Sequence, residues 1–215
     1  MTQRPTQEGT ALVEFQVVAL LALLPMVLGI LQMTLLLCGF HVLSFAAAEA
    51  ARAGSIDHAR IGGMYEALAD GLTPLVTDLA EAAADGGSLT SFVSARVNAR
   101  REVLQFASIE RMAPSAADFA DHGRDERGQR AIPNDALEHR PSAVGSRGGL
   151  SLQQANLLRI RVRYCHALVV PLVDRLLPAL LRVLDPDPGN QRCYLAGRVP
   201  LRVATSAPMQ SEAWQ

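Results

Sequence analysis

The chain has 215 residues, of which 49% are hydrophobic, and its formal net charge is −1. This composition is too apolar for an intrinsically disordered chain, and the length suits one sizeable domain or two small ones. All 20 basic residues are arginine and 21 acidic residues balance them, so no strong positive field would attract nucleic acid. Composition therefore indicates a folded protein with no nucleic-acid partner.

The N-terminal part contains an uncharged apolar run at residues 17–39, in which Gln32 and Thr34 are the only polar interruptions. As a helix the run would be about 35 Å long, enough to cross the ~30 Å hydrocarbon core of a bilayer. A secretory signal is the alternative, with cleavage at the alanines of 46–48, but signal peptides have a shorter apolar core and a basic leader. We therefore expect a transmembrane helix.

A glutamate, Glu14, stands just before this run and five residues after Gly9. Residues 9–54, GTALVEFQVVALLALLPMVLGILQMTLLLCGFHVLSFAAAEAARAG, combine a GxxxVEF opening, a proline within the helix and a closing alanine-rich stretch. This combination resembles the TadE-like segment of Tad (tight adherence) pilus assembly proteins, which are type IV pilin-like. The resemblance implies that a prepilin peptidase cuts after Gly9, so that Thr10 becomes the mature N-terminus and Glu14 its fifth residue.

The resemblance also implies a role and a location. The chain would be a minor pilin or pseudopilin that assists assembly or initiation of a Tad-type pilus for surface adherence. It would be a single-pass protein of the bacterial inner membrane, with its C-terminal region in the periplasm. Its partners would be membrane lipid, the prepilin peptidase, other pilins and the pilus assembly platform.

The position of Glu14 also has a physical explanation. A carboxylate near the end of a membrane helix is costly in hydrocarbon unless it is paired. After the cut, the amine of Thr10 would lie at the same depth, and Glu14 of one subunit could pair with the amine of its neighbour. Such a pair favours one register between helices. The alternative is a glutamate that faces headgroup water.

The remaining sequence divides by composition into an amphipathic helical region at 55–112, a polar loop at 113–149 and a strand-helix-strand region at 150–215. Within 55–112, apolar residues spaced by three or four positions predict a hairpin of two helices, with arginines on a solvated face of the second. The apolar series are Ile61, Met64, Leu68, Leu72, Leu75 and Leu79, and then Leu89, Val93, Val97 and Leu104; the arginines are Arg96, Arg100 and Arg101.

Two segments near the C-terminus, LRIRVRYC and RVPLRVATS, alternate apolar residues with arginine and predict two half-buried strands. The stretch between them, at 166–184, is apolar, but Asp174 and Arg175 at its middle make a second membrane span too costly. We expect it to be a helix packed on the sheet. The predicted fold class is α+β, with a leader at 1–9, a transmembrane helix at 10–54, a helical hairpin and a small antiparallel sheet.

Three cysteines bear on the compartment. Cys165 and Cys193 flank the predicted helix, each beside a predicted strand, so neighbouring strands could bring them within bonding distance. In the oxidising periplasm a disulfide between them would stabilise the fold by ~3–4 kcal/mol in the loop-entropy model. Two buried free thiols are the alternative. Cys38, at the end of the membrane helix, is expected to be an unpaired apolar residue.

Catalytic motifs are not evident in the sequence. The five histidines are scattered, and the chain has no HExxH pair, no Cys-x-x-Cys pair, no glycine-rich phosphate loop and no G-x-S-x-G elbow. We therefore expect no enzyme, no metal and no cofactor. Two alternatives to the pilin interpretation stay open: an unprocessed membrane anchor that carries a periplasmic binding domain, and a periplasmic hydrolase.

Overall fold

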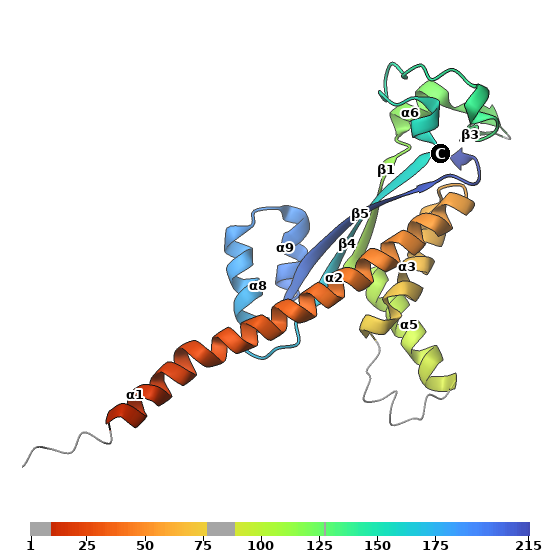
Figure 1. Ribbon diagram of the computed structural model, residues 1–215. Coiled ribbons are helices and arrows are strands. Elements are labelled where there is room, and N and C mark those ends of the chain that lie inside the picture. The colour runs from red at the N-terminus through yellow and green to blue at the C-terminus, as the bar shows by residue number, and fades with distance from the viewer. Residues whose placement is uncertain (1–9, 77–88, 127) are drawn as a thin grey trace, which may run out of the picture. The chain divides into compact units, whose positions relative to one another are not determined.

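The computed structural model describes residues 10–76, 89–126 and 128–215 of the chain, and it confirms the α+β class (Figure 1). The chain forms two compact units. The first contains the helical chain up to Cys38 and the segment Ala167–Val199. The second contains Gly39–His166 and Pro200–Gln215. The predicted leader at 1–9 lies outside the described residues.

The N-terminal helical chain consists of α1 (Thr10–Val18), a π-helical turn η2 (Ala19–Leu23) and α2 (Leu24–Ile56). Proline cannot donate a backbone hydrogen bond and its ring crowds the carbonyl of the preceding turn. The sequence therefore predicts a disturbed helix at Pro25. The structure places the wide turn directly before this proline, where the Leu24 N–H donates to the carbonyl of Ala19, five residues back.

The first unit is completed by two short helices, α8 (Val173–Leu184) and α9 (Pro188–Leu195), which pack against each other. Asp187 caps α9 by accepting from the Gly189 N–H at 2.9 Å, and Pro188 occupies the first helical turn. Asp185 accepts hydrogen bonds from Asn190 Nδ2 and from the Tyr194 hydroxyl, at 2.6 and 2.8 Å. These bonds hold the short connection between the helices.

The second unit contains the C-terminal part of α2, the helices α3 (Ile61–Val76) and α5 (Leu89–Phe106), and a three-stranded sheet. Four alanines of α2 are fully buried in its core: Ala46, Ala47, Ala50 and Ala51. On α3, the predicted apolar residues Met64, Leu68 and Leu72 are fully buried in the same core. The small side chains of α2 are therefore an internal packing surface of this unit.

The main sheet has the strand order β1-β4-β5, formed by β1 (Ala107–Ala113), β4 (Leu157–Ala167) and β5 (Arg198–Pro208). β4 and β5 coincide with the two predicted strands, and Leu158, Ile160 and Val162 are fully buried. β1, which the sequence places in the helical region, pairs antiparallel with β4, with Ala107 opposite Tyr164. The apolar residues of β4 share one core with α2 and α3.

The predicted helix between the strands forms as α8, and it belongs to the first unit, whereas most of the sheet belongs to the second. Inside the second unit, the helices that share a core with the sheet include α2, α3 and α5. Packing of α8 on the sheet therefore stays a prediction.

The polar segment 113–149 contains more regular structure than the expected long loop. It holds α6 (Ala116–His122), β2 (Arg124–Glu126), β3 (Gln129–Ile132) and a 3-10 turn, η3 (Leu137–His139). With β6 (Ala213–Trp214), β2 and β3 form a second small sheet; α7 (Leu152–Ala155) follows the segment. A capping box of Ser115 and Asp118 begins α6, and the buried Phe119 and Ile132 anchor the segment. Because this segment is held by single buried residues and capping residues, its sequence shows no regular spacing of apolar residues from which these elements could be predicted.

Replacing Gly71 by alanine tests the close approach of α3 to α2. A Cβ atom at Gly71 would lie 2.7 Å from both the Cα and the Cβ of Ala46, so one helix must move. We expect Gly71→Ala to destabilise the protein by about 1–3 kcal/mol, measured by chemical unfolding of the full chain in detergent. The control is Gly62→Ala on the same helix, where a Cβ meets nothing within 4 Å and stability should not fall. Equal stability of the two variants would contradict this packing.

Candidate functional site

The most extensive candidate surface is the N-terminal helix. Val13–Ile56 is long and apolar enough to cross a membrane, and only 6% of its most apolar window is buried within the chain. Large apolar side chains face outward along it, for instance Phe15 at 70% and Leu21 at 76% exposure. Contiguous exposed apolar surface of this extent marks a membrane or a protein partner. The helix therefore needs apolar surroundings that the described chain does not supply.

The residues predicted for processing and pairing lie at the start of this helix. Gly9 falls outside the described residues, and Thr10 is the first residue of α1. Glu14 lies within α1 and is exposed. Both cleavage after Gly9 and pairing of Glu14 with a neighbouring subunit's amine stay predictions.

The structure places one cysteine on a predicted strand and another on a helix that the sequence did not predict. Cys165 lies near the end of β4 and is 9% exposed, and Cys193 lies on α9 and is fully buried. They belong to different compact units, and a disulfide between them stays a prediction. Cys38 is free and exposed on α2.

Gln32 has a structural role that the sequence did not predict, where it counted only as a polar interruption of the apolar run. It lies on α2 and is 1% exposed, although most of its apolar neighbours are exposed. Its Oε1 accepts from the backbone N–H groups of Val169 and Val170, at 3.3 and 3.0 Å. Within the first unit, this amide therefore ties the segment before α8 to the apolar helix. A lone glutamine inside a membrane-length apolar run is the signal that could have found it.

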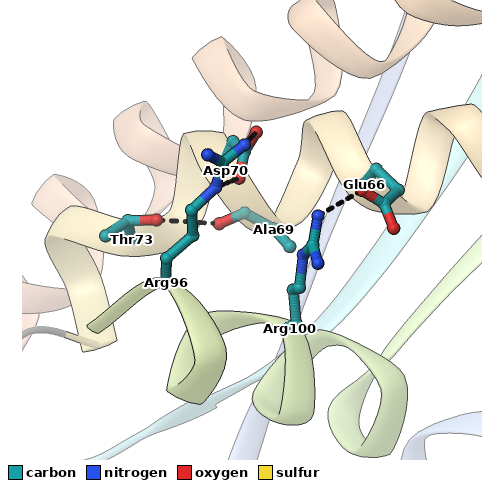
Figure 2. A network of polar contacts seen from close by, with 6 residues as sticks. All are labelled: Glu66, Ala69, Asp70, Thr73, Arg96 and Arg100. Carbon is teal, nitrogen blue, oxygen red and sulfur yellow. Dashed lines mark hydrogen bonds and ion pairs between the residues drawn. The ribbon is translucent and has the colours of Figure 1, made fainter. Parts of the chain in front are cut away.

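The helices α3 and α5 are linked by a polar network on their surface (Figure 2). Arg96 binds Asp70 through two nitrogens, its Nε lying 2.7 Å from Oδ1, and Arg100 binds Glu66. Hydrogen bonding to Asp70, and then its charge, raise the pKa of Arg96 above the ordinary value. Since all four side chains are substantially exposed, solvent screening keeps the contribution of these pairs small. Their clearer role is to fix which side of α5 faces α3.

The side of α5 that is buried differs from the one predicted. In the structure Val93, Val97 and Leu104 are 53%, 53% and 75% exposed, so the predicted apolar stripe is not core. Ala95, Ala99 and Val103 are buried instead. Small alanines allow closer approach of helices than the larger stripe would, and the arginine pairs of Figure 2 hold this orientation. The stripe of Val93, Val97 and Leu104 is thus a second exposed apolar surface.

An acidic hollow of about 320 Å³ lies beside the second sheet. It is lined by Arg124, Asp125, Glu126, Ala131, Pro133, Asp135 and Glu212. Burial raises the pKa of Glu212 above the ordinary value, and a hydrogen bond to Glu126 and repulsion from its charge raise it further. Among the described residues, no group of three or more histidine, cysteine or acidic side chains is placed to hold a metal ion.

Comparison of the chain with protein-family models, curated proteins and solved structures gives no match. The surfaces described above and the resemblance of residues 9–54 are therefore the features that bear on function.

Truncating neighbouring residues of α5 tests which of its faces is core. Val103 is fully buried and Leu104 is 75% exposed. We expect Val103→Ala to lower the free energy of unfolding by about 1–3 kcal/mol, because it removes buried apolar atoms and leaves a cavity. Leu104→Ala should change stability by less than about 0.5 kcal/mol. Chemical unfolding of the full chain measures both changes. A larger loss of unfolding free energy for Leu104→Ala than for Val103→Ala would mean that the face predicted from the spacing is the buried one.

Neutralising Glu212 tests the acidic hollow. A carboxyl whose pKa is raised in the folded state takes up its proton before the unfolded chain does, so folding gains stability as pH falls through that window. Above that window both states carry the charge, and the charged Glu212 is unfavourable in the fold. We therefore expect Glu212→Gln to raise the melting temperature at neutral pH, with an advantage over wild type that shrinks on acidification towards the ordinary glutamate pKa.

The partner residue provides the control for this experiment. In a Glu126→Gln background the repulsion is absent, so the gain from Glu212→Gln at neutral pH should be smaller. A gain that is constant with pH in both backgrounds would show that Glu212 is not perturbed.

Proposed function

We propose that this chain is a minor pilin or pseudopilin of the inner membrane, which assists assembly or initiation of a Tad-type pilus for surface adherence. The observation that carries the proposal is the exposed apolar helix Val13–Ile56, together with the exposed Glu14 near its beginning. A buried core helix would hide its apolar side chains, whereas this helix presents them outward. The resemblance of residues 9–54 to the TadE-like segment is the reason for proposing a Tad-type pilus as the assembly.

The proposed mechanism uses the geometry of α1. Cleavage after Gly9 by a prepilin peptidase would free the amine of Thr10, one helical turn before Glu14. In the plane of the membrane, the carboxylate of one subunit would then pair with the amine of the next. In low-dielectric surroundings an unpaired carboxylate is costly, so subunits docked out of register would be disfavoured. The exposed apolar side chains along the helix would supply the lateral contact area.

The second unit would then be the periplasmic part of the protein. Its buried alanines on α2 pack against its own helices, so the C-terminal portion of the long helix is covered, whereas most apolar side chains of the N-terminal portion are exposed. This division supports a single-pass arrangement in which the helix leaves the bilayer and enters a folded domain. A disulfide between Cys165 and Cys193 would form in that oxidising compartment.

Replacing Glu14 tests this function. We expect Glu14→Ala to leave membrane insertion intact and leave a mature chain that begins at Thr10, while pili are lost. The reason is that the substitution removes the carboxylate that selects the register but keeps an apolar helix. Intact mass of the protein purified from membranes gives the N-terminus, and electron microscopy of the cells gives the piliation.

Gln16→Ala is the matched control, because Gln16 is an exposed polar residue on the same short helix. It should leave both cleavage and piliation unchanged. A wild-type chain that still begins at Met1 would reject the processed pilin and favour an unprocessed anchor with a periplasmic binding domain. Normal piliation with Glu14→Ala would reject the pairing mechanism.

A further inference from the structure

The amphipathic helix α8 presents a stripe of exposed apolar side chains that the first unit leaves uncovered. Leu176, Leu180 and Val183 follow one another at helical spacing along it and are 61%, 56% and 82% exposed, and Leu172, the residue just before the helix, is 50% exposed. Leu184 extends the stripe at its end and is 66% exposed. The opposite side of the helix holds the buried Pro178. Apolar side chains this exposed on a short helix point to a partner that is itself apolar.

The charges beside the stripe indicate what kind of partner this is. Arg175 and Arg182 are two helical turns apart, so both lie along the same edge of the stripe, and both are exposed. The acidic residues at the two ends, Asp174 and Asp185, are half-buried. An apolar stripe edged by arginine is the pattern of a helix that lies in a membrane interface, where the long side chains reach anionic headgroups.

The tether to Gln32 sets the depth at which α8 lies. Val169 and Val170, just before the stripe begins, donate their N–H groups to Gln32 Oε1. Counted from Thr10, Gln32 is about 33 Å along the helix, roughly one hydrocarbon thickness. Counted back from Gly39, it lies about 10 Å inside the end of the apolar run. The first count places the start of α8 at the boundary between acyl chains and headgroups, and the second places it in the outer part of the same leaflet.

The direction of α8 agrees with this position. Within the first unit, α8 stands at an angle to the N-terminal part of α2 and is not parallel to it (Figure 1). A helix inclined to a membrane-spanning helix near one end of the span can lie along the bilayer surface.

We propose that α8 is a second membrane contact of this protein, with its stripe of Leu172, Leu176, Leu180 and Val183 inserted into the leaflet that contains Gln32. The ligand is an anionic lipid surface, with the stripe in the acyl region and Arg175 and Arg182 at the headgroups. The inference rests on the proposed membrane span of α1 and α2. It adds that the unassembled subunit is held to the bilayer at two places, so release of α8 must accompany its transfer into a fibre.

Spin labels on the full chain test this contact. The chain, with Cys38→Ser to remove the free thiol, is reconstituted into phosphatidylcholine vesicles that contain phosphatidylglycerol. A nitroxide is attached through Leu180→Cys, and its collisions with oxygen and with a water-soluble nickel chelate are measured. Two control labels are Leu21→Cys in the proposed span and Leu104→Cys on α5, both well exposed in the structure. The Cys38→Ser chain without an introduced cysteine gives the background.

We expect the label at 180 to collide often with oxygen and rarely with the nickel chelate, like the label at 21 and unlike the label at 104. Frequent nickel collisions at 180, as at 104, would place α8 in water and overturn the inference. Few collisions with either reagent would mean that a protein covers the stripe, which also overturns it. If the label at 21 is itself exposed to nickel, the proposed span fails and the inference falls with it; if only 180 is exposed, the span stands.

Discussion

One constraint governs this protein: a helix of membrane-spanning length has an apolar surface that its own chain covers in one portion only. Towards Ile56, alanines of the helix are buried with α3 and the sheet in an ordinary protein core. Towards Thr10, leucines, valines and phenylalanine point outward. The same helix thus meets two different environments.

The long apolar helix and two strands of the main sheet could be predicted from the sequence, because their signals are long and periodic. Many residues contribute to each of these signals: the uncharged apolar run at 17–39, and the alternation of apolar residues with arginine in β4 and β5. β1 could not be predicted in the same way, since Ala107–Ala113 has mixed polar and apolar residues and is a strand because β4 lies beside it. The structure of segment 113–149 was likewise hidden, since capping and a few buried anchors such as Phe119 create it.

The spacing of apolar residues predicts the buried face of α3 correctly and that of α5 wrongly. On α3 the apolar residues face the core, as the spacing predicts, whereas on α5 the larger apolar residues face outward and alanines face inward. Periodicity detects an amphipathic helix but does not say whether its apolar side meets its own chain or a partner. On α5 the buried side is the one that lets Arg96 and Arg100 reach Asp70 and Glu66 on another helix, and no local pattern contains those partners. Gln32 was missed for a related reason, since its partners are backbone groups far along the chain.

The wide turn at Ala19–Leu23 links Pro25 to the direction in which Glu14 projects from the apolar helix. A π-helical turn accommodates one more residue than an α-helical turn, so side chains before it are rotated about the axis relative to those after it. Glu14 lies before the turn, and Gln32, which bears the tether to α8, lies after it. The direction in which Glu14 projects from the helix, relative to the side that holds α8, therefore depends on the π-helical turn that precedes Pro25.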